Sequence, residues 1–349
     1  MTKILTIVGA RPQFVKLAPV LAALRARPRL QPLVVHTGQH FDPGMSDVFF
    51  DELGLPAPDH HLGIHGGSHG EMTGRMLTAI EQTIVAENPA AVLVVGDTNS
   101  TLAGALAASK LHVPVAHLES GLRSFNKTMP EEINRVLTDH VSSLLFCPTQ
   151  TAMSNLARES ITEGVHHVGD VMFDAILMFR IQAERMSRVL DRLGLREGAY
   201  SVATLHRAEN TDSAAQLGAL LAYLKHSTDK PVVLPLHPRT RQKIAEFGLS
   251  TDGLVVIEPV GYLDMIRLVS GAAHVLTDSG GLQKEAYFLR KPCVTLRTET
   301  EWTETITHGW NRLWTVDYYT PRTPISDYGD GHASKQIADI LEQFVQVNR

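Results

Sequence analysis

The chain has 349 residues, of which 44% are hydrophobic and 20% are charged, and its formal net charge is -5. This composition is typical of a globular protein, and the slight acidity argues against a nucleic-acid-binding protein, whose binding face is usually basic. The length is too great for one ordinary core and predicts two domains. No apolar run reaches the roughly 18 residues of a membrane helix, and Met1–Val8 has no signal-peptide pattern. We therefore expect a cytoplasmic protein that binds no membrane.

Strand-like and helix-like patterns alternate along the whole chain, which predicts parallel sheets with helices on both faces. The first helix places Phe14, Leu17, Leu21 and Leu24 on one apolar stripe, and a second helix is predicted near Met72–Ala86. The predicted strands are Lys3–Val8, Leu33–Thr37, Val92–Val95, Val113–Leu118, Leu144–Cys147, Ser201–Leu205, Pro231–Leu236, Leu254–Ile257, His274–Leu276 and Cys293–Leu296.

These elements predict an α/β fold of two doubly wound, Rossmann-like domains that face a central cleft. We expect the hinge near Gly169, which gives an N-terminal domain of residues 1-169 and a C-terminal domain of residues 170-331. A turn at Tyr328–Gly331 precedes the helix pattern Ala333–Val347, so residues 332-349 are expected to pack back on the N-terminal domain. In such sheets ligands bind beyond the carboxyl ends of the strands, where most of the unusual polar residues of this chain fall.

Cysteines and histidines give little sign of metal or redox chemistry. Cys147 and Cys293 each lie in an apolar, strand-like run, which predicts buried free thiols in a reducing compartment. Four histidines lie between positions 60 and 69, but the stretch has no Cys or HExxH partner. We expect neither a metal site nor a cofactor.

The segment Leu276–Glu285 joins a strand to a helix through Ser279, Gly280 and Gly281. Two glycines allow the backbone to approach a bulky anion, and the free N–H groups and positive dipole end of the helix face that anion. Glu285, one turn into the helix, is placed to accept hydrogen bonds from the hydroxyls of a ribose. The segment favours a ribose-linked diphosphate as ligand, although Gly-Gly pairs are also common in turns that bind nothing.

Basic side chains end strands in both halves. Arg11 and Lys16 lie near the start of the first helix, where two cations are unfavourable unless an anion sits beside them. An ordinary surface Arg and Lys is the alternative interpretation. His206 and His237 end two strands of the second half. A single histidine of this kind is usually structural, but two at equivalent strand ends favour a functional role.

The first half offers three carboxylates at or just beyond its strand ends. Asp97 follows a Val-Val-Gly run and is either a helix N-cap or a catalytic acid. Glu119 ends an apolar strand, where burial without a partner would be costly. Glu131 lies in the first turn of the next helix, and we expect it to pair with Arg135 one turn later.

Five short segments together resemble the bacterial non-hydrolysing UDP-N-acetylglucosamine 2-epimerases. They are Gly9–Pro12, Gly96–Thr98, His117–Arg123, Pro130–Arg135 and Asp278–Gln283, and they occur in the family's order. The resemblance extends from Lys3 to Gly331. It implies the glycosyltransferase type B architecture, a UDP-sugar substrate and a homodimer.

The resemblance also implies a reaction. These enzymes eliminate UDP across C1–C2 to form a 2-acetamidoglucal, and then add UDP back while a proton reaches the opposite face of C2. This route needs a base, an acid and cations for the departing diphosphate. By resemblance, the acid–base carboxylates are Asp97, Glu119 and Glu131, and the diphosphate and catalytic contacts are Arg11, Lys16 and His206. The resemblance also implies that the phosphate turn is Ser279, Gly280 and Gly281 and that the ribose ligand is Glu285. Further active-site contacts by resemblance are Arg135 and His237.

Two departures from the family pattern bear on the substrate. The segment Leu122–Pro130 is shorter than usual, and Glu301-Trp-Thr-Glu304 stands where Glu-Arg-Pro-Glu is typical. Both features resemble the branch that converts UDP-2,3-diacetamido-2,3-dideoxy-D-glucuronate to the mannuronate for O-antigen polysaccharide. Gln39 of the family's allosteric site is present, but Phe41 and Asp42 follow it, which weakens the expectation of activation by substrate.

Several alternatives remain open from the sequence. UDP-N-acetylglucosamine is the alternative substrate, and a hydrolysing epimerase would differ only in how well water is excluded. A UDP-sugar glycosyltransferase would share the architecture and the phosphate turn, but it would need an acceptor pocket, which three carboxylates and two cations fit poorly. A non-catalytic UDP-sugar sensor is the remaining alternative.

Overall fold

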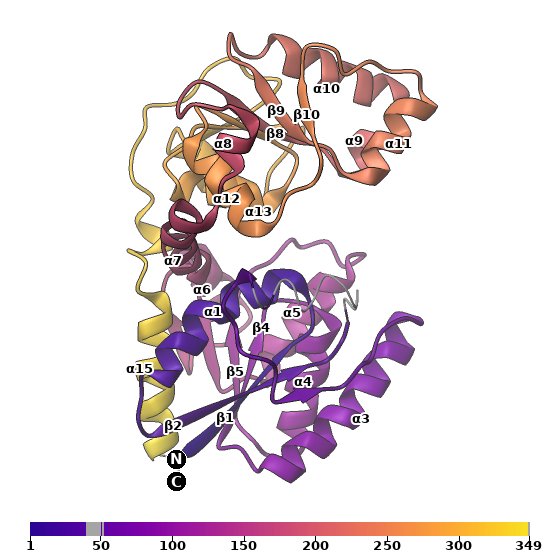
Figure 1. Cartoon of the computed structure of the whole chain (residues 1–349). Coiled ribbons are helices and arrows are strands. Elements are labelled where there is room, and N and C mark those ends of the chain that lie inside the picture. The colour runs from indigo at the N-terminus through magenta and orange to yellow at the C-terminus, as the bar shows by residue number, and fades with distance from the viewer. Residues whose placement is uncertain (40–49, 51, 348–349) are drawn as a thin grey trace. The chain divides into compact units, whose positions relative to one another are not determined.

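The computed structural model, which describes residues 1–39, 50 and 52–347, divides into two units (Figure 1). Unit 1 comprises Met1–Ala175 and Ser326–Arg349, and unit 2 comprises Ile176–Ile325. The sequence prediction placed the corresponding boundaries at 169/170 and 331/332. Gly169 itself has φ +84°, and a methyl group there would approach the Tyr328 carbonyl oxygen to 2.8 Å. Glycine is therefore required where these two segments of unit 1 meet.

Unit 1 contains a seven-stranded parallel sheet in the order β3-β2-β1-β4-β5-β6-β7. Its strands are β1 (Thr2–Val8), β2 (Leu30–His36), β3 (His60–His61), β4 (Ala91–Val95), β5 (Val115–Leu118), β6 (Leu144–Cys147) and β7 (Val165–His167). The five strands predicted in this half are confirmed. The two edge strands were missed, because they are short and consist mostly of histidine rather than apolar residues.

Helices cover both faces of this sheet. Helices α3, α4 and α5 pack side by side on one face, and α1 and α15 pack together on the other (Figure 1). The predicted stripe of α1 is buried, because its apolar residues recur on the face toward the sheet. The helices of this unit are α1 (Arg11–Arg25), α3 (His69–Glu87), α4 (Asn99–Lys110), α5 (Pro130–Val141), α6 (Gln150–Arg158) and α15 (Ala333–Val347), with the 3-10 turn η1 (Ser326–Tyr328).

The C-terminal helix α15 belongs to unit 1. Ile337 and Leu341 on its inner face are fully buried. The Asp174 carboxylate accepts a 2.7 Å hydrogen bond from the backbone N–H of Ser334 and one of 3.2 Å from that of Ala333. The free N–H groups at the start of α15 are satisfied in this way. The charged stretch after Gly169 is helical, as predicted, in α7 (Val171–Met186) and α8 (Val189–Leu193).

Unit 2 repeats the same topology with a six-stranded parallel sheet in the order β10-β9-β8-β11-β12-β13. Its strands are β8 (Ser201–Thr204), β9 (Val232–Pro235), β10 (Val255–Ile257), β11 (Val275–Thr277), β12 (Cys293–Thr295) and β13 (Asn311–Leu313). Its helices after α8 are α9 (Ala208–Thr211), α10 (Ala214–His226), α11 (Pro238–Glu246), α12 (Tyr262–Gly271), α13 (Gly280–Phe288) and α14 (Thr303–Thr307). Strand order reverses beside β1 in one unit and beside β8 in the other, so both sheets are doubly wound. The predicted fold class is confirmed.

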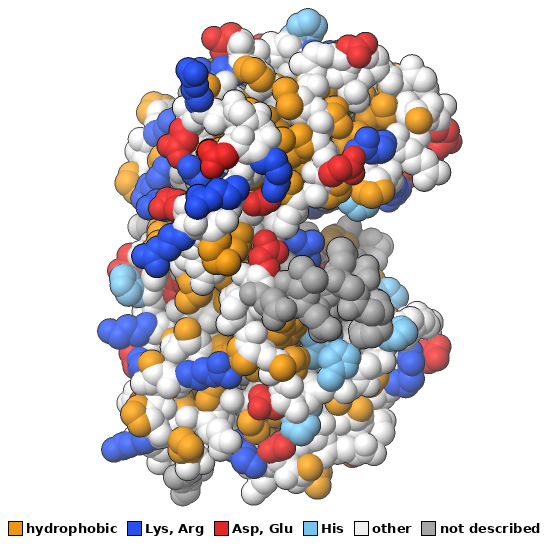
Figure 2. All heavy atoms as spheres, viewed as in Figure 1, with side chains coloured by type: hydrophobic (Ala, Val, Ile, Leu, Met, Phe, Trp, Pro, Cys, Tyr) orange, Lys and Arg blue, Asp and Glu red, His pale blue; other side chains and the backbone are white. Residues whose placement is uncertain are grey.

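Further features of the described residues bear on the class of protein. Cys147 and Cys293 are buried and free, as predicted. Within the described ranges, no cluster of three His, Cys, Asp or Glu residues is arranged to hold a metal ion. No described helix combines the length and the apolar character needed to cross a membrane. Acidic and basic side chains intermingle on the visible face of unit 2 (Figure 2).

Candidate active site

The turn after β4 presents Asp97. Gly96 adopts φ +64°, and α4 is capped by the hydroxyl of Thr98, which accepts the Thr101 N–H. The N-cap interpretation of Asp97 is therefore wrong, because Thr98 fills that position. The Asp97 carboxylate instead accepts a 2.6 Å hydrogen bond from Arg135 Nη2 of α5. Asp97 is thus free of a capping role and held by a cation.

Glu119 directly follows β5 and adopts the left-handed conformation, with φ +67°. Its carboxylate forms an ion pair with Lys16 Nζ of α1, and the Glu119 side chain is only 8% exposed. Burial lowers the pKa of Lys16, but the attraction of Glu119 outweighs it and the pKa lies above its ordinary value. The anion expected beside Lys16 is supplied, in the described residues, by the Glu119 carboxylate. The cost of burying Glu119 is offset by the same contact.

The carboxylates of Asp97 and Glu119 belong to neighbouring turns. A methyl group at Gly96 would lie 3.6 Å from Glu119 Oε2. Asp97 also contributes to the field that favours protonated Lys16. The structure therefore brings together four of the predicted residues, namely Lys16, Asp97, Glu119 and Arg135, at the carboxyl ends of β4 and β5.

Helix α5 holds Arg135 differently from the prediction. Arg135 Nη1 donates to Glu132 at 3.0 Å, whereas the side chain of Glu131 is exposed and has no hydrogen bond or ion pair among the described residues. The expected Glu131–Arg135 pair is wrong, because Arg135 extends toward Asp97 and Glu132 lies on that side of the helix. Glu132 also accepts the N–H groups of Ser124 and Phe125 at 2.8 and 2.9 Å.

Glu132 consequently fixes the start of the short 122–130 loop. Burial raises the pKa of the Glu132 carboxyl, but the hydrogen bonds from Ser124, Phe125 and Arg135 outweigh burial and bring the pKa below its ordinary value. This residue was not singled out in the sequence. Its adjacency to Glu131 was visible, but only the helix orientation decides which of the two faces the sheet.

The turn after β1 is organised by Gln13, another residue that sequence reasoning missed. Its side-chain oxygen accepts the N–H groups of Gly9 and Ala10 at 2.7 and 2.9 Å, and its Nε2 donates to the Val95 carbonyl at 2.6 Å. Gln13 therefore ties the β1 turn to the end of β4. Arg11, in the first turn of α1, is exposed.

In unit 2, Asp278 is the centre of the strand-end contacts. Its Oδ2 accepts the backbone N–H groups of His206 and Arg207, both at 2.9 Å, and its Oδ1 lies 3.1 Å from His206 Nδ1. Burial raises the pKa of Asp278, but His206 and these N–H groups outweigh it, and the pKa lies below its ordinary value. Asp278 thus fixes the ring of His206, whose side chain remains 46% exposed.

The adjacent glycine turn opens α13. Ser279 is the N-cap and accepts the Leu282 N–H. A methyl group at Gly280 would overlap the Glu301 carboxylate, whereas at Gly281 the nearest atom would lie 3.9 Å away. Arg297 Nη1 binds Glu301 at 2.8 Å. The two glycines therefore differ in the room for a side chain, since only at Gly280 would a methyl group overlap another residue.

The remaining two predicted residues of unit 2 lie on helices. His237 is the N-cap of α11, and its ring nitrogen accepts the Arg239 N–H at 3.2 Å. This cap gives His237 a structural role that His206 does not share. Glu285 lies half-buried in the second turn of α13. Of the allosteric positions considered in the sequence, Phe41 and Asp42 fall outside the described residues.

Two doubly wound sheets, with ionisable side chains at the carboxyl ends of their strands, define the two-Rossmann-unit class of proteins with glycosyltransferase type B architecture. Residues 22–342 match the family described as UDP-N-acetylglucosamine 2-epimerase. The chain belongs to this family.

Individual relatives match over almost the whole chain. A Pseudomonas aeruginosa protein, the UDP-2,3-diacetamido-2,3-dideoxy-D-glucuronate 2-epimerase, is 52% identical over 98% of this chain and 100% of its own length. A Methanococcus maripaludis homologue of UDP-N-acetylglucosamine 2-epimerase is 48% identical over the same shares. The crystal structure of the Methanocaldococcus jannaschii UDP-GlcNAc 2-epimerase in complex with UDP-GlcNAc and UDP has a TM-score of 0.82 and 41% identity, covering 98% of this chain and 99% of that one.

Proposed function

We propose that this chain is a non-hydrolysing C2 epimerase of a UDP-2-acetamido sugar, and that UDP-2,3-diacetamido-2,3-dideoxy-D-glucuronate is its favoured substrate. The observation that carries the proposal is the full-length, 52% identity to the Pseudomonas enzyme of that name. Its product, the mannuronate, would enter surface polysaccharide biosynthesis. We further propose a cytoplasmic homodimer.

The geometry of unit 1 supports elimination and re-addition. The positive charge of Lys16 favours the ionised form of Glu119, which a base requires, and Arg135 holds Asp97 in the neighbouring turn. One carboxyl group takes the C2 proton while the C1–O bond to UDP breaks and a C1–C2 double bond forms. When UDP attacks C1 again, another carboxyl group delivers a proton to the opposite face of C2. Asp97, Glu119 and Glu131 are the candidates for these two roles.

The geometry of unit 2 supports binding of the UDP. Gly280 and Gly281 open α13 after the N-cap Ser279, at the positive end of the helix dipole. His206 is held beside this turn through Asp278, and Glu285 follows one turn later. We assign the diphosphate to the turn and the ribose to Glu285, with Arg11 and His237 as further contacts.

The segment Glu301–Glu304 supports the choice of substrate branch. Trp302 Nε1 lies 3.5 Å from the position of a methyl group at Gly280, and Lys284 Nζ lies 4.1 Å from the centre of the indole ring. The departure from the usual Glu-Arg-Pro-Glu therefore lies directly beside the proposed phosphate turn, where it can act on the ligand.

Incubation with each UDP-sugar in D2O tests the function. We expect deuterium at C2 of the recovered UDP-sugars, with a higher kcat/KM for the diacetamido uronate than for UDP-N-acetylglucosamine. The reverse preference would assign the chain to UDP-N-acetylglucosamine, which is named in the descriptions of two relatives that are 42% and 45% identical. Retained C2 protium with transfer of the sugar to an acceptor would support a glycosyltransferase, and unchanged sugar would support a sensor.

Two glycine-to-alanine variants test the assignment of the diphosphate to the glycine turn. Gly280→Ala is expected to weaken UDP binding roughly tenfold, because the methyl group enters the occupied space at the start of α13. Gly74→Ala, at an exposed position of α3, is the control and is expected to bind UDP like the wild type, since a methyl group there meets no atom within 4 Å. Calorimetric titration with UDP measures both. Equal affinities in the two variants would contradict the assignment of the diphosphate to this turn.

A further inference from the structure

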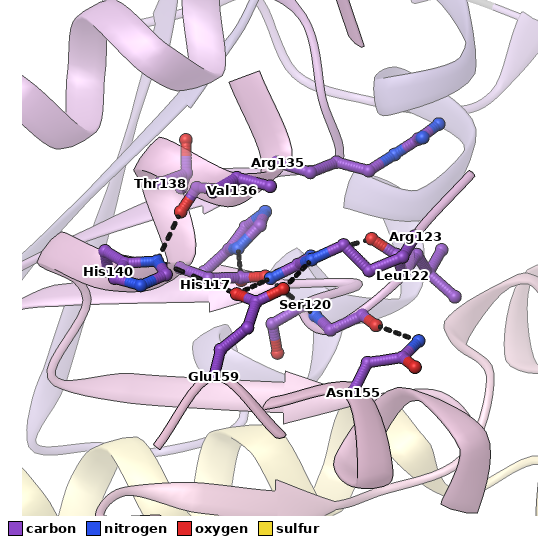
Figure 3. Close-up of polar contacts among 12 residues, drawn as sticks. His117, Ser120, Leu122, Arg123, Arg135, Val136, Thr138, His140, Asn155 and Glu159 are labelled. Carbon is purple, nitrogen blue, oxygen red and sulfur yellow. Dashed lines mark hydrogen bonds and ion pairs between the residues drawn. The ribbon is translucent and has the colours of Figure 1, made fainter. Parts of the chain in front are cut away.

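Unit 1 contains a buried cluster of charged side chains, of which Figure 3 shows His117, Arg123 and Glu159. Asp139 of α5 contacts His117 of β5 at 2.6 Å through Oδ1, and Arg123 Nη1 at 2.7 Å through Oδ2. Arg123 also donates to both oxygens of Glu159, at 2.7 and 2.8 Å. The side chains of His117, Asp139 and Arg123 are no more than 1% exposed. Such burial is stable only when every charge has a partner.

Both ring nitrogens of His117 face acceptors. Nδ1 faces the Asp139 carboxylate, and Nε2 lies 2.7 Å from the carbonyl oxygen of Gly96. Burial raises the pKa of Asp139, but His117 and Arg123 outweigh it and hold the pKa below its ordinary value, so Asp139 is ionised. A carboxylate and a carbonyl oxygen only accept hydrogen bonds, so each nitrogen of His117 is placed beside an acceptor.

Asp139 reaches both of the turns that carry the candidate carboxylates. Through His117 it holds the Gly96 carbonyl, directly before Asp97. Its Oδ2 also accepts the Gly121 N–H at 3.0 Å, two residues after Glu119. Gly96, Glu119 and Gly121 all have positive φ, at +64°, +67° and +77°. A glutamate in this conformation is strained and persists only where its surroundings hold it.

We propose that His117 and Asp139 are positioning residues of the epimerase, which set the spacing between the Asp97 and Glu119 carboxylates without touching the substrate. The inference rests on the proposed function. A displacement of about 1 Å at a reacting group lowers turnover roughly a hundredfold, so a hydrogen bond that fixes Gly96 acts on kcat. Substrate affinity depends mainly on UDP contacts and is unaffected.

Two isosteric substitutions separate the contacts of His117. In His117→Asn the amide nitrogen replaces Nδ1, so the Asp139 contact is kept and the Gly96 contact is lost. In His117→Gln the amide nitrogen reaches the place of Nε2 and keeps the Gly96 contact. We expect kcat to fall roughly ten- to hundredfold in H117N with KM and UDP affinity within about twofold, and to recover most of this loss in H117Q.

Glu159→Gln is the matched control, because it disturbs the outer end of the same cluster. We expect a lower melting temperature but a kcat close to that of the wild type. If H117N does not fold, Asp139→Asn replaces it and is expected to show the same loss of kcat at unchanged KM. A kcat that follows the melting temperature alike in H117N, H117Q and E159Q, or a normal kcat in H117N, would overturn the inference. Absence of C2 exchange in the wild type would instead overturn the proposed function.

Discussion

Asp97→Asn is expected to lower kcat by roughly 10²- to 10⁴-fold while the variant still binds UDP. The amide keeps an oxygen that accepts the 2.6 Å hydrogen bond from Arg135, so the turn after β4 retains its position. The side chain, however, can no longer take or deliver a proton. Steady-state kinetics on the preferred UDP-sugar and calorimetric titration with UDP measure the two effects separately.

Asp339→Asn provides the control for the loss of an acidic side chain. Asp339 pairs with Arg27 on the surface of unit 1 and makes none of the strand-end contacts, so its replacement should leave kcat unchanged.

Glu131→Gln should behave like Asp97→Asn if Glu131 is the second proton carrier. Near-normal rates in both Asp97→Asn and Glu131→Gln would remove these residues from the mechanism.

Glu119→Gln is expected to cause a loss of kcat of similar size, and in addition to destabilise the fold by about 3 kcal/mol. The reason for the second effect is the ion pair, since Lys16 is only 17% exposed and would keep a charge without its partner. Urea unfolding at neutral pH measures the free energy of unfolding, and kinetics measure turnover.

The double variant Lys16→Met, Glu119→Gln separates the two roles. Removing both charges should restore most of the stability, because no unpaired buried charge remains. Turnover should stay low if Glu119 transfers a proton. A double variant that regains both stability and wild-type kcat would show that Glu119 serves only to neutralise Lys16.

Much of the fold follows from local patterns. The apolar stripe of α1 and the short apolar strands in both halves identify their elements, since burial on a sheet demands those periodicities. The edge strands β3, β7 and β13 were missed, because each is short and mostly polar, whereas the equally short β10, β11 and β12 are apolar runs. Their formation depends on a neighbouring strand rather than on their own sequence.

The position of the candidate site was predictable from the sequence, but the contacts among its residues were not. Strand ends of a parallel sheet meet at one edge, so the sequence alone indicated that Lys16, Asp97 and Glu119 lie near one another. It did not indicate that Lys16 pairs with Glu119, because that contact joins residues 103 positions apart. The sequence analysis also favoured Glu131 over Glu132 as the partner of Arg135. The helical spacing permits both pairs and could not decide between them.

The chain's sequence by itself determined the two Rossmann-like sheets, the family and the residue types at the strand ends, because these depend on periodicity and on short local segments. Only the tertiary structure decided which charges meet. It assigned Thr98 rather than Asp97 as the cap, and it placed Asp139 behind both turns. The physical reason is that a buried charge requires a partner of opposite charge, and that partner can lie far away in the sequence. The side of α5 that faces the sheet is likewise fixed by packing rather than by residue spacing.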